Sequence, residues 1–149
     1  MNRSIWLSNS QLIEKPWGYE RQWTTMLPLG GKVLYINSGA KTSMKMFDTK
    51  DEVLFVQQGE LIATIADENI FSSEQAVVRQ VTITSGSVLN IQAGCPYQLE
   101  ASKSGAIVIE ISNQQSGCTR IEDDYGRAID GEKALLIKEK LERLTNDCN

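Results

Sequence analysis

The central part of the sequence consists of short segments rich in β-branched and aromatic residues, and turn signals, many of them containing glycine, separate these segments. Segments of this length with such turns are typical of sheets built from many short strands. The expected strands are residues 19–26, 32–37, 42–47, 52–58, 60–66, 77–84, 87–91, 97–101 and 106–112. The pattern predicts an all-β sandwich or barrel rather than an α/β fold, in which strands would alternate with helices.

The C-terminal segment has a different periodicity. From about residue 131 to 145, apolar side chains recur every three or four residues, which is the spacing of one face of an α-helix. These side chains are Ala134, Ile137, Leu141 and Leu144. Asp130 stands in the position of an N-cap. We expect one amphipathic helix of about four turns, packed on the outside of the β domain or on a second subunit.

The composition excludes several classes of protein. Of the 149 residues, 41% are hydrophobic and 23% are charged, as in an ordinary globular domain, and the length suits a single domain. The formal net charge of −4 argues against binding nucleic acid through a basic surface. No apolar run approaches the roughly 20 residues of a membrane helix, and the N-terminus does not resemble a signal peptide. We therefore expect a cytoplasmic protein with no membrane partner.

The sequence contains no histidine, which removes the commonest metal ligand and general base. The three cysteines, Cys95, Cys118 and Cys148, are widely spaced and include no CxxC pair. This spacing argues against a zinc site and fits reduced, unpaired thiols. No feature of the sequence would lower the pKa of Cys95, which we expect to be unreactive.

Two segments of the predicted barrel have the spacing of the two cupin motifs. Residues 39–59 match the first motif, in which a glycine is followed after five residues by His-x-His, then by a glutamate and a final glycine. These positions are occupied here by Lys45, Phe47, Glu52 and Gly59. Residues 86–101 resemble the second motif, with Tyr97 in the position of its histidine. The sequence is therefore similar to the cupin superfamily.

Two further segments resemble the cupins related to type II phosphomannose isomerase and to the C-terminal domain of mannose-1-phosphate guanylyltransferases. Residues 15–20, KPWGYE, resemble the entry segment of these proteins, and residues 122–127, EDDYGR, resemble the closing segment. The resemblance implies a single cupin domain over residues 1–149. Its double-stranded β-helix, or jelly-roll barrel, would span about residues 15–127, with the C-terminal helix at about 131–145. It also implies a homodimer.

The metal-binding positions depart from the family pattern. Metal-dependent cupins hold their ion with the two histidines or their substitutes, the glutamate and the later histidine. In this chain only Glu52 is a good ligand, because Phe47 has no donor atom and Tyr97 is a weak ligand unless ionised. Lys45 is a cation, and a divalent ion needs several deprotonated N, O or S donors. We expect no metal and no cofactor.

Strand parity places Lys45, Phe47, Glu52, Leu54 and Val56 on inward positions, where an unpaired lysine is strongly unfavourable. In one interpretation, Lys45 pairs with Glu52, Tyr97 adds a hydrogen bond, and the pair replaces the metal as a structural link. In a second, the Lys45 ammonium polarises a carbonyl or holds a phosphate while Glu52 or Tyr97 transfers protons. In a third, the barrel is closed and filled.

Large apolar side chains take the outward positions on the same strands, and they should not be left in water. They are Met44, Met46, Val53 and Phe55. We expect either the N-terminal residues 5–7 or a second subunit to cover them.

Lys15, Trp17 and Arg127 are the candidate substrate-binding residues. Arg127 suits a phosphate, although an ion pair with Asp123 or Asp124 is the alternative. Lys15 is a second phosphate candidate or a solvated lysine, and Trp17 is either a ligand platform or a plug in the barrel.

These features predict a metal-free cupin related to mannose-6-phosphate isomerase that acts on or binds a sugar or sugar phosphate in the barrel. An active enzyme would be of isomerase or epimerase type, with Lys45, Glu52 and Tyr97 as catalytic residues. The alternatives are a non-catalytic sugar-binding module and a structural or regulatory cupin with a filled barrel. A cavity reached by Lys45 and Arg127 would favour binding, whereas closure by Phe47 and Tyr97 would favour a filled barrel.

Overall fold

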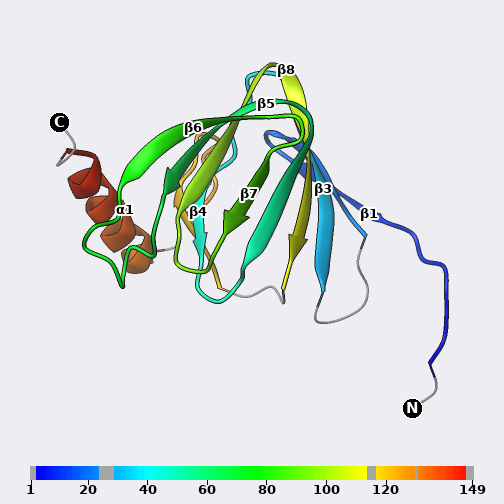
Figure 1. Ribbon diagram of the computed structural model, residues 1–149, viewed down its shortest axis with the longest axis horizontal. Coiled ribbons are helices and arrows are strands. Elements are labelled where there is room, and N and C mark those ends of the chain that lie inside the picture. The colour runs from blue at the N-terminus through cyan, green and yellow to red at the C-terminus, as the bar shows by residue number, and fades with distance from the viewer. Residues whose placement is uncertain (1–2, 24–28, 114–116, 130, 147–149) are drawn as a thin grey trace.

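The computed structural model describes residues 3–23, 29–113, 117–129 and 131–146. These residues form nine strands and one helix (Figure 1). The elements are β1 (Gln11–Lys15), β2 (Gly18–Gln22), β3 (Gly30–Ile36), β4 (Met44–Phe47), β5 (Glu52–Ala66), β6 (Val78–Thr84), β7 (Val88–Ile91), β8 (Tyr97–Ser112), β9 (Cys118–Glu122) and α1 (Gly131–Asn146). All the strand pairs are antiparallel, and the predicted all-β fold with a C-terminal helix is confirmed.

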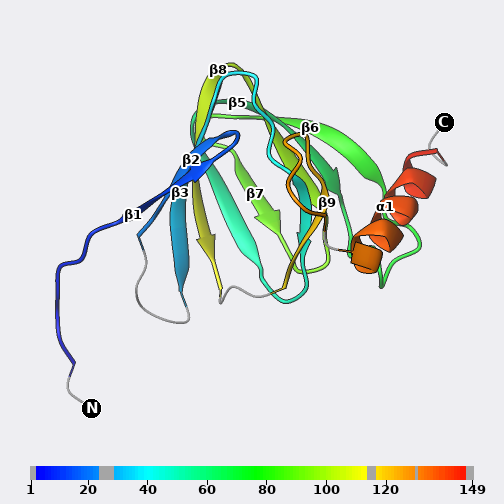
Figure 2. The ribbon, with the colours of Figure 1, turned by 180° about the vertical axis from the view of Figure 1, so that it is seen from behind.

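The long strands β5 and β8 each take part in two sheets. The first half of β5 pairs with the second half of β8 in a sheet of order β1-β2-β3-β8-β5-β7. The second half of β5 pairs with the first half of β8 in a sheet of order β9-β4-β8-β5-β6. Because both strands pass from one sheet to the other, the sheets close around a common interior, as Figures 1 and 2 show. This architecture is the jelly-roll barrel.

The bend in β5 explains a difference from the predicted strands. The sequence predicts two strands with a turn at Gly59, whereas the chain continues from residue 52 to 66 as one strand with two register shifts. Gly59 has a φ of 89°, and a Cβ there would clash with the carbonyl oxygen of Gly105 on β8. Glycine thus lets the two strands bend together in close contact. β8 is likewise one strand instead of two, and β1 and β9 are additional to the predicted set.

A hydrophobic core fills much of the space between the two sheets. It contains Trp17, Leu34, Ile36, Leu54, Val56, Leu61, Ala63, Ile83, Ile91, Tyr97, Leu99, Ala101, Ala106 and Val108. The predicted inward positions of Leu54 and Val56 are confirmed, since both side chains are fully buried. Burial of this apolar surface provides the main driving force for closing the barrel.

Helix α1 packs on the outer face of the second sheet (Figure 2). Ala134 and Ile137 are fully buried, and Leu141 and Leu144 pack partly buried beside them, so the predicted apolar stripe is confirmed. The predicted N-cap, Asp130, lies outside the described residues. Among the described residues, no helix is both long and apolar enough to cross a membrane.

The outward apolar residues of β4 and β5 have different surroundings. Met44 and Met46 are buried against the Ile137 cluster, so the helix covers them rather than the N-terminal segment or a second subunit. Residues 3–10 instead extend away from the barrel, with Ile5 fully exposed (Figures 1 and 2). Val53 and Phe55 keep 41% and 37% of their surface exposed. The expectation that residues 5–7 cover these side chains is therefore wrong.

Candidate functional site

The four residues at the cupin metal-binding positions lie together inside the barrel. Lys45 and Tyr97 are paired across β4 and β8, and the Lys45 Nζ lies 5.3 Å from the centre of the Tyr97 ring. The same Nζ lies 5.8 Å from the centre of the Phe47 ring. The Tyr97 hydroxyl donates a hydrogen bond of 3.0 Å to Glu52 Oε2, and both side chains are buried. The structure thus brings together the three residues predicted to be catalytic.

A row of alternating charges extends from Glu52 across the inner face of the first sheet. The Nζ of Lys50, in the loop before β5, lies 3.5 Å from Glu52 Oε1 and 2.8 Å from Glu110 Oε1. The Nζ of Lys32 lies 3.7 Å from Glu110 Oε2 and 3.1 Å from Glu20 Oε2. Lys32 and Glu110 are directly opposite each other on β3 and β8, so strand pairing itself fixes part of this order. Lys50, Glu52, Glu110 and Glu20 are all buried.

The two carboxylates beside Lys50 differ in their affinity for protons. Burial raises the pKa of Glu110, but the ammonium groups of Lys32 and Lys50 outweigh burial, and its pKa lies below the ordinary value. Burial and the neighbouring Glu110 carboxylate raise the pKa of Glu52 above the ordinary value. Burial and Glu52 also raise the pKa of Tyr97 well above that of a free tyrosine. Glu52 therefore holds a proton more readily than an ordinary glutamate, while Glu110 remains ionised.

The predicted ion pair between Lys45 and Glu52 is not formed. In the described part of the chain, no carboxylate oxygen lies within 4.0 Å of the Lys45 Nζ, and Lys50 is the cation next to Glu52. Burial and the charge of Lys32 lower the pKa of Lys45. The charges of Glu110 and Glu52 oppose this decrease from beyond ion-pair distance, and the Nζ lies over the rings of Phe47 and Tyr97. The structural link of the interior is thus made by Lys50, and Lys45 is left with aromatic neighbours.

The three predicted substrate-binding residues each have a partner in the protein. Trp17 is 4% exposed and belongs to the barrel core, which favours its interpretation as a plug. The Nζ of Lys15 lies 3.4 Å from Glu20 Oε1, at the end of the row of charges. The Nη2 and Nε of Arg127 lie 2.6 and 3.0 Å from Asp123 Oδ1, which favours the ion-pair interpretation. A role of these residues in substrate binding stays a prediction.

The donor set at the four motif positions does not fit the metal ion of metal-dependent cupins. Glu52 supplies the one carboxylate, and the Tyr97 hydroxyl donates a hydrogen bond to that carboxylate. Phe47 has no donor atom, and the ammonium groups of Lys45 and Lys50 lie close to where the ion would be held. Two cations and one carboxylate repel a divalent ion. The described residues also contain no group of three or more His, Cys, Asp or Glu side chains that could hold a metal.

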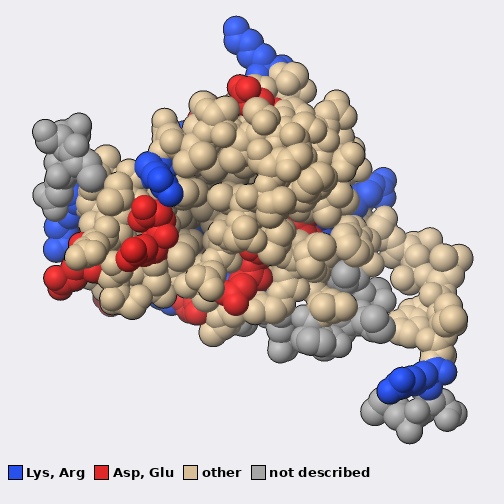
Figure 3. Space-filling view, viewed as in Figure 1, with Lys and Arg blue, Asp and Glu red and all other residues tan. Residues whose placement is uncertain are grey.

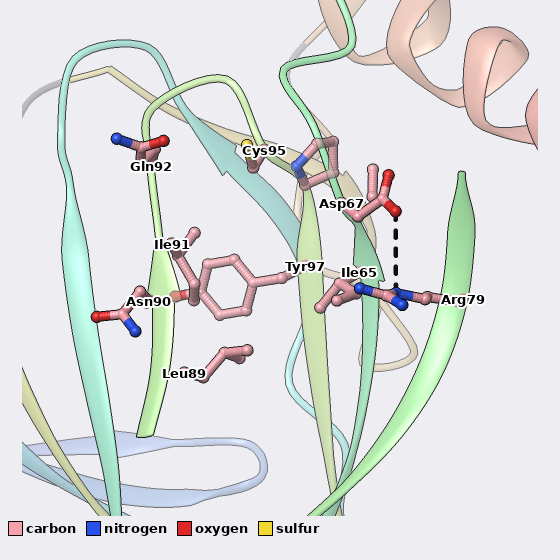
Figure 4. Close-up of a pocket in the computed structure, with 11 residues that line it drawn as sticks. Ile65, Asp67, Arg79, Leu89, Asn90, Ile91, Gln92, Cys95 and Tyr97 are labelled. Carbon is pink, nitrogen blue, oxygen red and sulfur yellow. Dashed lines mark ion pairs between the residues drawn. The ribbon is translucent and has the colours of Figure 1, made fainter. Parts of the chain in front are cut away.

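A pocket of about 250 Å³ opens beside Tyr97, between β6 and β7 (Figure 4). In the described residues both strands pair only with β5, so the edges of the two sheets separate here. The ring of Tyr97 points from β8 toward β7 and forms one wall of the pocket (Figure 4). Cys95 also lines it, and burial together with Asp51 raises the pKa of its thiol, so the thiolate is disfavoured. Through this pocket the Tyr97 ring, whose hydroxyl is hydrogen-bonded to Glu52, can be reached from the protein surface.

Sequence reasoning missed four charged residues of the interior: Glu20, Lys32, Lys50 and Glu110. Lys50 had a usable signal, because extending the strand parity of Glu52 back by two residues places it inward. Glu110 had none, because it lies between Ile109 and Ile111 and hydrophobic alternation would place the isoleucines inside. Its burial depends on Lys32 and Lys50, which come from distant parts of the chain.

The sequence matches no protein-family model and no curated protein sequence. Solved structures with the cupin fold are nevertheless similar to this chain. CapF from Staphylococcus aureus, a capsular polysaccharide assembling protein, has a TM-score of 0.61 at 13% identity, over 73% of this chain and 30% of its own. Oxalate decarboxylase OxdC from Bacillus subtilis (S161A mutant) has a TM-score of 0.62 at 18% identity, over 72% of this chain and 28% of its own.

KdgF from Halomonas sp. is similar over nearly its whole length, with a TM-score of 0.59, 13% identity, and coverage of 77% of this chain and 96% of its own. By contrast, this chain spans less than a third of the CapF and oxalate decarboxylase chains. At these identities the similarity establishes the cupin fold, in agreement with the curled antiparallel sheets and the single C-terminal helix.

Proposed function

We propose that this cupin-fold protein binds a sugar or sugar phosphate at the end of the barrel formed by Lys45, Glu52 and Tyr97, without a metal ion. The proposal includes a relation to mannose-6-phosphate isomerase and a reaction of isomerase or epimerase type. The description of CapF as a capsular polysaccharide assembling protein supports a carbohydrate-related role for this fold.

The observation that carries the proposal is the environment of Lys45. Every other lysine of the interior has a carboxylate within 4.0 Å, whereas Lys45 has aromatic rings. It also stands at a position where metal-dependent cupins have a ligand to their ion. A positive charge in this place supplies the electrostatic part of the ion's chemistry, because it can hold a phosphate or stabilise a developing negative charge on a carbonyl oxygen.

The charge balance of the interior supports an anionic ligand. The ammonium groups are those of Lys15, Lys32, Lys45 and Lys50, and the carboxylates are those of Glu20, Glu52 and Glu110. One positive charge is in excess even with all three carboxylates ionised. A phosphorylated sugar would neutralise this excess in a partly desolvated environment, where charge interactions are strong.

The proton transfers of an isomerisation would fall to Glu52 and Tyr97. In an aldose–ketose isomerisation a base removes a proton from the carbon next to the carbonyl, the proton is returned to the former carbonyl carbon, and a second proton moves between the two oxygens. A carboxyl group whose pKa is raised by burial accepts and returns a proton more readily than an ordinary glutamate. The Lys45 ammonium would stabilise the enediolate oxygen between the two steps.

The test is to measure binding and proton exchange with a panel of hexose 6-phosphates, including mannose 6-phosphate. We expect wild-type protein to bind at least one of them and to exchange the C2 proton for deuterium in heavy water. Lys45→Met should abolish exchange and weaken binding at least tenfold. The matched control is Lys41→Met, which removes a more exposed lysine that is paired with Asp124. Binding without exchange would favour a sugar-binding module, and no binding would overturn the proposal.

A filled barrel with a structural or regulatory role is the second candidate. It is favoured by the burial of Trp17 and Tyr97 and by the ion pairs that Lys50 makes with both of its neighbouring carboxylates. If this candidate is correct, the wild type, Lys45→Met and Lys41→Met will all show no binding of any sugar in the panel.

We further propose that the protein is a homodimer and that the outer face of the first sheet forms the contact. On this face Val53 lies opposite Ile111 and Phe55 lies opposite Val88. Val88 and Ile111 are 52% and 53% exposed. Figure 3 shows, on the side viewed there, a broad area over the barrel that is almost without charged side chains. Exposed apolar side chains clustered on a sheet are typical of an interface between subunits.

A further inference from the structure

We infer that the pocket between β6 and β7 is the subsite for the ring of the bound sugar, and that Asp67 and Arg79 together recognise one ring hydroxyl. This inference rests on the proposed function and adds to it the residues that determine which sugar is accepted. Neither residue belongs to the cupin motifs or to the row of buried charges.

The two sides of the pocket differ in chemistry (Figure 4). Leu89 and Ile91 of β7 and Ile65 of β5 form apolar walls next to the Tyr97 ring. On the other side, Arg79 extends from β6 toward the pocket and lies beside the carboxylate of Asp67. A sugar ring has a matching pair of surfaces, because its C–H groups pack against apolar and aromatic side chains while its hydroxyls need polar partners.

Asp67 and Arg79 are placed to share a hydroxyl. The Arg79 Nε and the Asp67 Oδ2 are 3.9 Å apart, which is too far for a direct hydrogen bond. A hydroxyl oxygen about 2.8 Å from each atom fits this gap, accepting from the guanidinium and donating to the carboxylate. Asp67 is held for this role by its other oxygen, which accepts a 2.9 Å hydrogen bond from the backbone N–H of Val77. Within the described residues the Arg79 side chain makes no hydrogen bond, so its donors remain available.

The electrostatics of the pocket favour a hydroxyl over a phosphate. Asp67 lines the pocket, and burial together with the charges of Asp51, Asp67 and Glu68 raises the pKa of the Cys95 thiol, so carboxylates lie near this part of the pocket. A phosphate would be repelled by these carboxylates, whereas a neutral hydroxyl can use the Asp67 oxygen as an acceptor. The Lys45 Nζ lies 5.3 Å from the centre of the Tyr97 ring, and Lys45 does not line this pocket. A sugar ring in this pocket would therefore present a neutral hydroxyl, rather than its anionic group, to Asp67 and Arg79.

The volume of the pocket limits the ligand to one sugar ring. Pockets for drug-sized ligands have about 300–1,000 Å³, and this pocket has about 250 Å³. An oligosaccharide would extend far beyond it. A ring bound here would lie against Tyr97, whose hydroxyl donates a hydrogen bond to Glu52. The pocket and the proposed reaction centre are thus joined through one side chain.

The experiment measures dissociation constants for the panel of hexose 6-phosphates and for their monodeoxy analogues, each lacking one ring hydroxyl. Arg79→Gln and Asp67→Asn should each weaken binding of the preferred sugar about tenfold or more, as expected for a hydrogen bond to a charged group. For one deoxy analogue the two variants and the wild type should bind equally, because the recognised hydroxyl is missing. Arg21→Gln is the control, since Arg21 is an exposed arginine on β2 outside the pocket.

The outcomes separate this inference from the proposed function. Suppose that the wild type binds a sugar phosphate, that Lys45→Met weakens this binding and that Arg79→Gln leaves it unchanged. The proposed subsite is then wrong, and the proposed function stands. If the two variants weaken the binding of every deoxy analogue as much as the binding of the parent sugar, Arg79 does not recognise a ring hydroxyl and the inference is wrong. If the wild type binds no member of the panel, both fail. Amide NMR shifts on sugar addition should be largest at residues 65–67 and 89–92, and shifts confined to other parts of the barrel would also contradict the subsite.

Discussion

The two halves of β8 differ in the side chains that point into the barrel. In the first half Tyr97, Leu99 and Ala101 point inward and are buried, while the polar Gln98 and Glu100 lie on the other side. In the second half the inward positions include Glu110 and Ser112, both buried, and the outward positions are all isoleucine. The inward side of β8 therefore stays apolar through Ala106 and Val108 and becomes polar at Glu110 and Ser112, where the usual amphipathic pattern is inverted.

The inversion shows which part of the interior is not simply a hydrophobic core. Buried charges are strongly unfavourable unless they are paired, and Glu110 is paired with Lys32 and Lys50. Replacing such a group by a well-packed apolar residue is often neutral or stabilising. Charges retained at the end of the barrel that contains Lys45 therefore suggest a role beyond folding. The outward isoleucines suggest a covered outer face.

The largest expected effect is the loss of charge in the inverted half. Glu110→Gln leaves Lys32 and Lys50 without their shared carboxylate and should lower the free energy of unfolding by about 3 kcal/mol or more. Glu100→Gln, in the ordinary half, removes the same charge from an outward position and should change it by less than about 0.5 kcal/mol. Denaturant unfolding of both variants checks the difference. The double variant Lys50→Met/Glu110→Leu should recover much of the loss, and equal effects at residues 100 and 110 would contradict the comparison.

The apolar residues of the two halves should show the reverse contrast. Leu99 is 1% exposed in the core, and Leu99→Ala should lower the free energy of unfolding by about 2–5 kcal/mol. Ile111 is 53% exposed, and Ile111→Ala should lower it by less than about 1 kcal/mol when the protein is dilute. Thermal or denaturant unfolding at low protein concentration tests this pair. A comparable loss at Ile111 would mean that the outer face packs against its own chain.

The pH dependence of stability should depend on the same carboxylates. The pKa values of Glu110 and Glu20 are lowered in the folded protein, so the unfolded chain binds more protons in acid. Their contribution is present above the ordinary glutamate pKa of 4.5 and is lost as the pH falls below it. The raised pKa of Glu52 acts in the opposite direction. Unfolding measured from pH 7 to pH 3 should show a shallower acid loss in Glu110→Gln and a steeper one in Glu52→Gln; parallel curves would contradict these assignments.

Ile111→Asp should have the smallest effect on the stability of the folded chain and a large effect on its assembly into dimers. The outward side chain is exposed in a single chain, so the folded monomer should tolerate the charge. In the proposed dimer the carboxylate would be buried without a partner, and sedimentation should show a shift to monomer. The first sheet is not the interface if the wild-type protein is monomeric at high concentration. The same conclusion follows if Ile111→Asp leaves a dimer intact.

The sequence predicted the parts of the molecule that depend on local spacing. The positions of Lys45, Glu52 and Tyr97 inside the barrel follow from the motif spacing, and the helix stripe follows from its period. The partner of Glu52 could not be predicted in this way, because Lys50 lies in a loop and Glu110 is brought to it only by the pairing of β5 with β8. The pocket at Asp67 and Arg79 depends on where two sheet edges separate, which no short segment of sequence records.

The central claim is that Lys50 links the interior while Lys45 is held for a ligand. The most direct measurement is the free energy of unfolding of Lys50→Met and Lys45→Met at neutral pH in the absence of sugar. Lys50→Met should lose about 3 kcal/mol or more, because two buried carboxylates lose their shared cation. Lys45→Met should lose nothing or gain stability, since the lowered pKa of Lys45 shows that the fold disfavours its charge. Equal losses in the two variants, with the loss in Lys45→Met recovered by adding Glu52→Gln, would show that Lys45 is itself a structural partner of Glu52 and would contradict the account.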